Sequence, residues 1–125
     1  MASAAPRTMA KRTLTIVIPA YNAEATLGDC LAAIAASERQ PDELILYDDG
    51  STDGTGDMAR AAGAVVLRND GPPRGPAVGR NAGVAIAKSE LIVFVDADVS
   101  IHPTALGRLE AAFINDPKIS AAFGS

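Results

Sequence analysis

A continuous apolar run ends in two acids at Leu91-Ile92-Val93-Phe94-Val95-Asp96-Ala97-Asp98. Residues 14–18 and 44–47 form two further continuous runs, and residues 64–67 and 119–123 form shorter or weaker ones. Apolar side chains at successive positions are typical of strands that are covered on both faces, as in a parallel sheet. These runs therefore predict the strands of a buried sheet.

The first segment between these runs has the spacing of an amphipathic helix. Leu27, Leu31 and Ile34 fall on one face, and the alanines around them favour the helical state. Asn22 precedes this pattern, and we expect it to be the N-cap of the helix. Glu24 would then lie in the first turn, where the helix dipole favours a negative charge.

Three more helical patterns fill the remaining gaps. We expect helices over residues 55–62, with Gly63 as the stop, and over residues 77–88. A fourth helix should run from Pro103 at position N1 to the end signal at residues 115–117. Strands and helices then alternate along the chain. This order predicts an α/β fold with an open, mostly parallel sheet and helices on both faces, a Rossmann-like three-layer α/β/α domain.

Size, charge and hydropathy restrict the class of protein. A chain of 125 residues suits one domain, which we assign to residues 13–125, and residues 1–12 read as a flexible tail without the apolar core of a signal peptide. The net charge of −4 argues against a nonspecific nucleic-acid binder. No apolar run reaches the roughly 18 residues that cross a bilayer, and the single cysteine, Cys30, lies on an apolar helix face as a small core residue. We therefore expect a cytoplasmic protein with no transmembrane segment in this chain.

Polar residues follow four of the predicted strands. In an open parallel sheet, ligands bind beyond the carboxyl ends of the strands, so we expect these residues to converge on one edge. They are Pro19-Ala20-Tyr21-Asn22, Asp48-Asp49-Gly50-Ser51-Thr52-Asp53-Gly54-Thr55, Arg68-Asn69-Asp70 and Asp96-Ala97-Asp98.

Asp96 and Asp98 are the candidates for a metal site. If the strand continues through them, carboxylates two positions apart point to the same side, and their repulsion favours a divalent cation. Mg²⁺ and Mn²⁺ prefer such oxygen ligands together with phosphate oxygens and waters. The alternative is that these acids cap the next helix or simply end the strand.

Asp48 and Asp49 are the candidates for contact with a nucleoside. A carboxylate can accept hydrogen bonds from the imide of uracil, from the amide edge of guanine or from ribose hydroxyls. The alternative is an Asx turn and a helix cap. We expect residues 51–55 to shape the turn, and either Asp48 or Asp49 to meet the ligand.

Arg80 lies in the segment Gly79-Arg80-Asn81-Ala82-Gly83 and offers a planar fork of donors that suits phosphate. The alternative for Arg80 is an ion pair with Asp96 or Asp49. His102, the only histidine, could reach a bound diphosphate, but we expect it to cap the helix that follows it. The glycine spacings of a dinucleotide fingerprint and of a P-loop are both absent.

The order of these motifs resembles the family 2 glycosyltransferases of GT-A fold, from about residue 13 to the end of the chain. The motifs that carry the resemblance are Ile16-Val17-Ile18-Pro19-Ala20-Tyr21-Asn22, Asp48-Asp49-Gly50-Ser51-Thr52-Asp53-Gly54-Thr55, Gly79-Arg80-Asn81-Ala82-Gly83 and Asp96-Ala97-Asp98. The resemblance implies the N-terminal nucleotide-sugar-binding portion of an inverting enzyme. It also implies a UDP- or GDP-linked sugar as donor and Mn²⁺ or Mg²⁺ as cofactor.

The resemblance further implies which residues would surround the nucleoside. Asp49 would hold the base, with Asp48 close by, and Glu24 would assist at the base and ribose. The segment that borders the base and ribose would be Pro19, Ala20, Tyr21 and Asn22.

Three residues would serve the diphosphate and the metal by the same resemblance. Arg80 would lie near the diphosphate, Asp96 would face the ribose or the donor, and Asp98 would bind the metal ion. The general base and the acceptor-binding region would follow the part that matches, so we assign no catalytic base. We expect either a truncated portion of a longer protein or a chain that a partner completes, which alone binds nucleotide weakly and transfers sugar poorly.

An incomplete sheet would expose an apolar face or a strand edge, which predicts a homo-oligomer. Two other functions are open. One is a non-catalytic nucleotide-binding module. The other is a nucleotidyltransferase, although such enzymes usually carry a Gly-rich basic segment directly after the first strand, where this chain has Pro19-Ala20-Tyr21-Asn22.

Overall fold

The fold is a five-stranded sheet in the order β3-β2-β1-β4-β5, and every pair of neighbours is parallel. The computed structural model describes residues 12–115 and 122–123, so residues 1–11 of the predicted tail (1–12) and most of the last predicted strand lie outside the described residues. The strands are β1 (Leu14–Ala20), β2 (Glu43–Asp48), β3 (Val65–Arg68), β4 (Leu91–Val95) and β5 (Ala122–Phe123). The predicted alternation and the parallel α/β class are confirmed.

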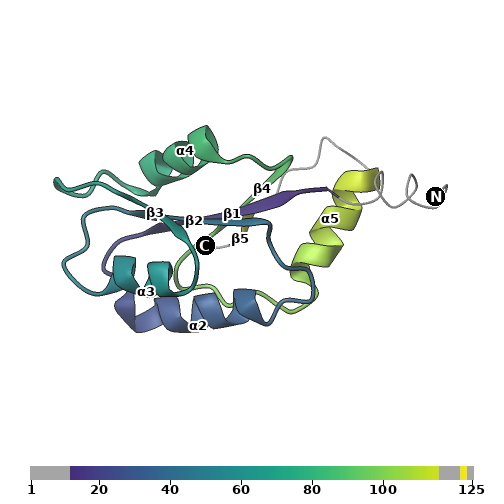
Figure 1. The fold of residues 1–125 in the computed structure, drawn as a ribbon, viewed down its shortest axis with the longest axis horizontal. Coiled ribbons are helices and arrows are strands. Elements are labelled where there is room, and N and C mark those ends of the chain that lie inside the picture. The colour runs from purple at the N-terminus through teal and green to yellow at the C-terminus, as the bar shows by residue number, and fades with distance from the viewer. Residues whose placement is uncertain (1–11, 116–121, 124–125) are drawn as a thin grey trace.

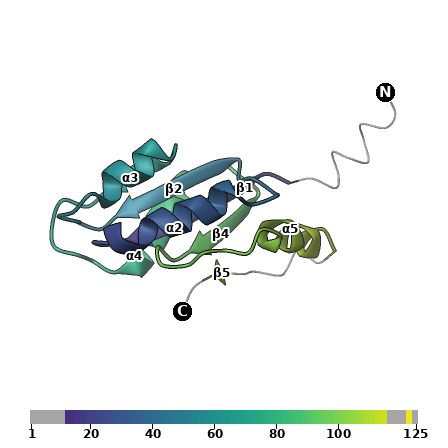
Figure 2. The same ribbon diagram turned by 90° about the horizontal axis from the view of Figure 1, so that it is seen from below.

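Helices cover both faces of this sheet (Figures 1 and 2). The described helices are α2 (Glu24–Ala35), α3 (Thr55–Ala61), α4 (Pro76–Ile86) and α5 (Ala105–Asn115). In both views α2, α3 and α5 lie on one face, and α4 lies on the other. The three layers that the sequence predicts are therefore present. Among the described residues, no helix combines the length and hydropathy needed to span a bilayer.

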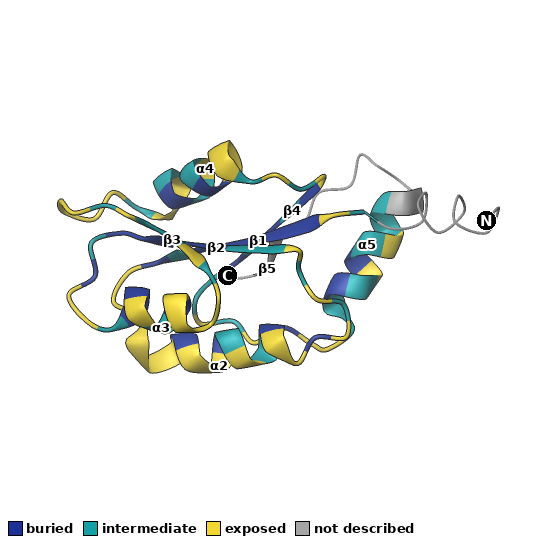
Figure 3. Ribbon diagram, viewed as in Figure 1, coloured by how far each residue is buried: buried dark blue, intermediate teal, exposed yellow. Residues whose placement is uncertain are grey.

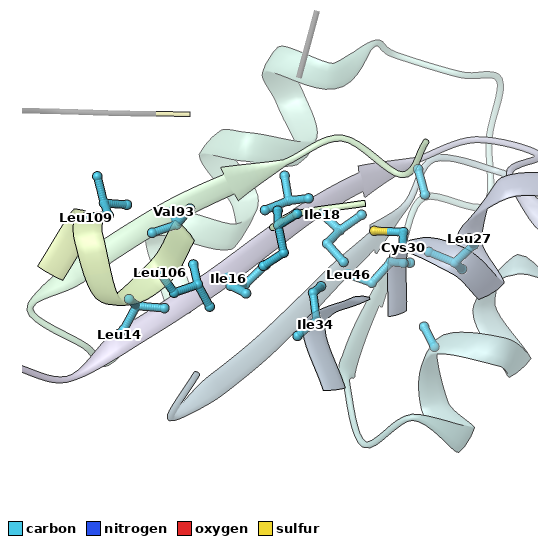
Figure 4. Packing of buried hydrophobic residues seen from close by; sticks show 14 of the residues in the cluster. Leu14, Ile16, Ile18, Leu27, Cys30, Ile34, Leu46, Val93, Leu106 and Leu109 are labelled. Carbon is cyan, nitrogen blue, oxygen red and sulfur yellow. The ribbon is translucent and has the colours of Figure 1, made fainter. Parts of the chain in front are cut away.

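The main hydrophobic core lies between the sheet and the layer of α2, α3 and α5. Alternate residues of β1 face this layer, and they pack with Leu27, Cys30 and Ile34 of α2 and with Leu106 and Leu109 of α5 (Figure 4). Cys30 is fully buried in this core, as predicted. Burial is concentrated on the strands and on the inward faces of the helices (Figure 3). The buried central strands therefore hold the loops at their ends in position.

Helix α4 approaches the opposite face of the sheet closely because two of its residues lack a side chain. A Cβ at Gly83 would lie 2.4 Å from Cγ1 of Val17, and one at Gly79 would lie 3.0 Å from Cδ2 of Tyr47. The backbone of α4 thus contacts β1 and β2 directly. This contact sets the height of Arg80, the residue that follows Gly79, above the sheet.

The prediction that Asn22 is the N-cap of α2 is wrong. Ala23 occupies the N-cap and makes no side-chain cap bond, while Asn22 has a positive φ of 46°. The first amides of this helix donate instead to the turn after β2: Ala23 N to Oγ1 of Thr55 at 2.9 Å and Glu24 N to Oδ2 of Asp53 at 3.1 Å. These acceptors lie about thirty positions further along the chain and take the place of a local cap. No local sequence pattern indicates such a distant cap.

Two other helix ends can be compared with their predictions. Gly63 follows α3 with a φ of 89°, a conformation suited to glycine, as its predicted role as a stop requires. Helix α5 begins at Ala105 rather than at Pro103, because a turn in which Ala105 N donates to the His102 carbonyl precedes it. Nδ1 of His102 accepts from Thr104 N at 3.2 Å, so this side chain caps the entry to α5.

Candidate nucleotide-binding site

The polar residues singled out in the sequence lie at the carboxyl edge of the sheet. The parallel register pairs Ala20 of β1 with Asp48 of β2, and Asp48 with Arg68 of β3. β4 pairs with the other side of β1 and ends next to Asp96. Three consecutive strand ends therefore present Tyr21, Asp49 and Asp96 along one edge.

A pocket of about 300 Å³ opens at this edge beside the amino end of α4. Four of its lining residues are expected site residues, and four come from the end of β2 and from the segment that enters α4. The lining residues are Pro19, Ala20, Tyr21, Tyr47, Asp49, Pro73, Gly75 and Pro76. A largely apolar pocket with one carboxylate suits a flat heterocycle that carries an N–H group.

Asp49 is the acid of this pocket, and the loop between β3 and α4 surrounds it. Its carboxylate accepts from Nδ2 of Asn69 at 2.9 Å, from Gly75 N at 2.8 Å and from Arg74 N, which reaches Oδ1 at 3.0 Å and Oδ2 at 2.9 Å. Burial acts to raise the pKa of Asp49, but these donors outweigh it and hold the pKa below the usual value. Asp49 is therefore a fixed anion.

Asp48 makes different contacts from those of Asp49. Its carboxylate is 2% exposed, accepts from Ser51 N at 2.9 Å and pairs with Arg68 at 2.7 Å. It lines a separate polar depression together with Gly56 of α3. The sequence left open which of the two acids meets a ligand, and the pocket contains Asp49.

The acids after β4 do not lie on a continued strand. β4 ends at Val95, and the chain then turns, with Val99 N donating to the Asp96 carbonyl at 3.0 Å. The premise that strand alternation aligns Asp96 and Asp98 is therefore wrong. The turn leaves Asp98 exposed, and no side chain of residues 12–113 donates a hydrogen bond to its carboxylate.

Arg80 and Asp96 form an ion pair. Nη2 of Arg80 donates to Oδ1 of Asp96 at 3.2 Å, and the guanidinium lies over the ring of Phe94, 6.0 Å from its centroid. The sequence offered this pair as the alternative to a phosphate-binding Arg80. The two roles are compatible, because the Arg80 side chain is 35% exposed and its remaining donors can serve a second anion.

Cys30 lies directly beneath this turn. Its thiol is within 3.7 Å of the Asp96 carbonyl oxygen. Burial, and then the negative charges of Asp98 and Asp96, raise the pKa of Cys30 to about 11. The thiol is therefore protonated at neutral pH and belongs to the core.

The donor set after β4 fits a hard divalent cation only in part. Asp98 supplies free carboxylate oxygens, and Asp96 keeps the oxygen that Arg80 does not take. Within the described residues, no group of three or more His, Cys, Asp or Glu side chains could hold a metal ion. Such a site suits an ion that takes one or two carboxylates and completes its shell with phosphate oxygens and water, as Mg²⁺ and Mn²⁺ do.

Asn22 and Glu24 lie outside the lining of the pocket. Oδ1 of Asn22 accepts from Thr52 N at 2.8 Å and so joins the end of β1 to the turn after β2. Glu24 is exposed in the first turn of α2, beside Gly54. Both residues connect the two turns that flank the edge.

Tyr47, Asn69 and the residues around Arg74 escaped the sequence analysis as site residues. Tyr47 could have been found as the aromatic residue directly before the two acids, at the end of a buried strand. Asn69 was noted only as one of the residues after the third strand. The loop with Arg74 gave no signal, because its prolines and glycines predict only irregular structure.

The fold and this edge define a parallel α/β domain with an acid-lined pocket and an acidic turn beside an arginine. The chain belongs to glycosyl transferase family 2, whose sequence model matches residues 15–124. Among curated proteins, the succinoglycan biosynthesis protein ExoU of Rhizobium meliloti is 40% identical over 98 residues, which are 75% of this chain and 28% of ExoU.

Solved structures agree with this assignment. Staphylococcus aureus TarS 1-349 in complex with UDP-GlcNAc matches with a TM-score of 0.72 and 29% identity, over 83% of this chain and 31% of TarS 1-349. The glucosyl-3-phosphoglycerate synthase of Mycobacterium tuberculosis, in complex with Mn²⁺, UDP and glucosyl-3-phosphoglycerate, matches with a TM-score of 0.67 and 32% identity, over 86% and 42% of the respective chains. The chain thus has the GT-A fold and spans less than half the length of these relatives.

Proposed function

We propose that this chain supplies the donor and metal site of an inverting glycosyltransferase that transfers a sugar from a nucleotide-diphosphate sugar to an acceptor. The observation that carries the proposal is one continuous edge that holds the base pocket, Arg80 and the turn of Asp96 and Asp98. Membership of glycosyl transferase family 2 supports it. So does the presence of UDP-GlcNAc in TarS and of UDP in the mycobacterial synthase.

The nucleoside would occupy the pocket beside Tyr21. Pro19, Ala20 and the Tyr21 ring offer flat apolar contact to the base, and Asp49 accepts a hydrogen bond from its N–H edge. Asn22 and Glu24 border the ribose from the amino end of α2. Asp48 contributes indirectly, because it fixes the turn that carries Asp49.

The diphosphate would lie between the pocket and the turn after β4. Arg80 offers donors at this position, and its pair with Asp96 orients the guanidinium. Asp96 would face the ribose or the donor with its remaining oxygen. As the sugar–phosphate bond breaks, charge grows on the diphosphate, and a fixed cation such as Arg80 stabilises that charge.

Asp98 of the DXD motif would hold Mn²⁺ or Mg²⁺, with phosphate oxygens as further ligands. The ion supplies counter-charge to the leaving diphosphate. Mn²⁺ in the mycobacterial synthase supports this choice. The carboxylate of Asp98, which is exposed and accepts from no side chain of residues 12–113, is the feature of this chain that fits it.

The remaining proposals concern the context of the domain. We assign residues 13–125 to the donor-binding domain and place the protein in the cytoplasm. The general base and the acceptor site would come from outside the described residues, and the domain would self-associate through its open sheet.

Thermal unfolding with nucleoside diphosphates, with and without Mn²⁺, tests the proposed function. A nucleotide at 100 times its Kd should stabilise the fold by about 2.7 kcal/mol. The Mn²⁺-dependent part should vanish in Asp98→Ala. It should persist in Asp29→Ala, which removes an exposed acid from the outer face of α2. The absence of a shift with any nucleotide would overturn the proposal.

A further inference from the structure

We infer that the pocket selects uridine diphosphate over guanosine diphosphate, because the loop between β3 and α4 leaves Asp49 free to accept only one further hydrogen bond. The inference rests on the proposed function and deepens it by choosing the nucleotide. It depends on three features: the number of acceptor positions on Asp49, the rigidity of the groups that occupy them, and the part of the pocket wall that Tyr47 forms.

A carboxylate offers about four lone-pair positions, two on each oxygen. Oδ1 of Asp49 accepts from Nδ2 of Asn69 and from Arg74 N, and Oδ2 accepts from Gly75 N and shares the bond from Arg74 N. Three donors thus occupy a carboxylate that can serve about four. Because Arg74 N is shared between the two oxygens, one acceptor position of the carboxylate remains for a ligand.

The three donors are held in place by the rest of the loop. Asn69 is fixed at both ends of its amide: Oδ1 accepts from Gly71 N at 3.0 Å, and Nδ2 also donates to the Pro72 carbonyl at 2.8 Å. The loop packs so tightly on the turn after β2 that a Cβ at Gly50 would lie 2.7 Å from the Gly71 carbonyl oxygen. The hydrogen bonds from the loop to Asp49 are therefore already formed before a ligand binds.

Uracil and guanine differ in the number of hydrogen bonds that they can donate to this carboxylate. The uracil imide presents a single N–H between two carbonyl groups. Guanine presents two adjacent donors, N1–H and the 2-amino group, and these pair best with both oxygens of a carboxylate. Next to Asp49 one guanine donor would stay unpaired in a largely apolar pocket, which weakens binding.

The part of the pocket wall that Tyr47 forms prevents a larger base from avoiding this mismatch by a shift. The Tyr47 ring lines the pocket and is 8% exposed. Behind it lies the backbone of α4 at Gly79, where a Cβ would be 3.0 Å from Tyr47 Cδ2 and 3.1 Å from Pro19 Cβ. The ring has no space to retreat towards α4.

Calorimetric titration of the intact chain with UDP, GDP and inosine diphosphate, in the presence of Mn²⁺, tests the inference. Inosine diphosphate keeps the two rings and N1–H of guanine but lacks its 2-amino group. UDP should bind at least about tenfold tighter than GDP, a factor that corresponds to ~1.4 kcal/mol. Inosine diphosphate should also bind more tightly than GDP, because its single donor fits the single free position.

Equal affinities for UDP and GDP would overturn the inference while leaving the proposed function intact. So would inosine diphosphate that binds no better than GDP, because size rather than the donor count would then decide. If no nucleotide binds, the proposed function and the inference both fail.

The variant Asn69→Ala provides a test from the side of the protein. It frees one acceptor position on Asp49, so the UDP-to-GDP affinity ratio should fall several-fold towards one. The neighbouring variant Asp70→Ala removes an exposed acid that pairs with Arg68, and it should keep the wild-type ratio. An unchanged ratio in a folded Asn69→Ala protein would contradict the inference.

Discussion

The acids after β2 and the acids after β4 stand at the same edge of the sheet but in opposite conditions. Asp48 and Asp49 are 2% and 5% exposed, and donors from the protein surround both carboxylates. Asp96 is half-buried with one ion pair, and Asp98 faces solvent. Protein donors hold the first pair, with one acceptor position left on Asp49, whereas the carboxylates of the second pair have more oxygens free.

This difference separates two ways in which acids serve one ligand. Removing a buried carboxylate that protein donors hold costs stability, and such a carboxylate gives a fixed acceptor for a base. An exposed carboxylate contributes little to the fold and is free to bind a cation. The stability and binding effects of substitutions at the two strand ends should therefore divide cleanly.

The largest expected effect is on stability at the first strand end. Asp48→Ala should lower the free energy of unfolding by about 2 kcal/mol, because it leaves the amide of Ser51 and Nη1 of Arg68 without their acceptor. Asp98→Ala, the matched change at the other strand end, should alter it by less than about 0.5 kcal/mol. Urea unfolding of both variants measures this contrast, and equal losses would remove the distinction.

A smaller effect should appear in acid. The pKa of Asp49 is lowered in the folded state, so as pH falls the unfolded chain takes up the proton first and stability is lost. The stabilisation is complete above the usual value of 3.8 and disappears as pH falls through the lowered folded-state pKa. The urea midpoint of the wild type should therefore fall more steeply with pH in this range than that of Asp49→Asn. Parallel curves would show that the hydrogen bonds to Asp49 contribute no such linkage.

Arg80→Lys should also have only a small effect on stability. Its partner Asp96 is half-buried and Arg80 is 35% exposed, so the pair should contribute less than about 1 kcal/mol. A lysine keeps the charge but loses the planar fork, so nucleotide affinity should fall several-fold while the melting temperature barely moves. A loss of stability as large as that of Asp48→Ala would mean that the second strand end is structural as well.

The sequence predicted the sheet well because its central strands are buried on both faces. A continuous apolar run such as residues 91–95 can be recognised as a strand without knowing which elements pack on it. The acids that follow such runs mark the edge where the candidate site lies. The short edge strand β3, which is not buried, and the bounds of α4 were also predicted to within a few residues.

Features that depend on distant partners were not predictable from the sequence. The cap of α2 comes from residues 51–55, so Asn22 gave a false local signal. The turn after Val95 releases Asp96 and Asp98 from strand geometry. The place of Tyr47 in the pocket depends on the missing side chain of Gly79, a pairing that becomes visible only once α4 lies on β2.

The capping of α2 by the turn after β2 has a consequence for the order of folding. The amino end of α2 obtains its acceptors only after the chain has passed through β2 and returned to the same edge. An isolated helix of twelve residues is marginal in water. We therefore expect β1, α2, β2 and the start of α3 to form in one cooperative step. Amide exchange at Ala23 and Glu24 should then follow the opening of the turn at residues 51–55 rather than the fraying of a helix end.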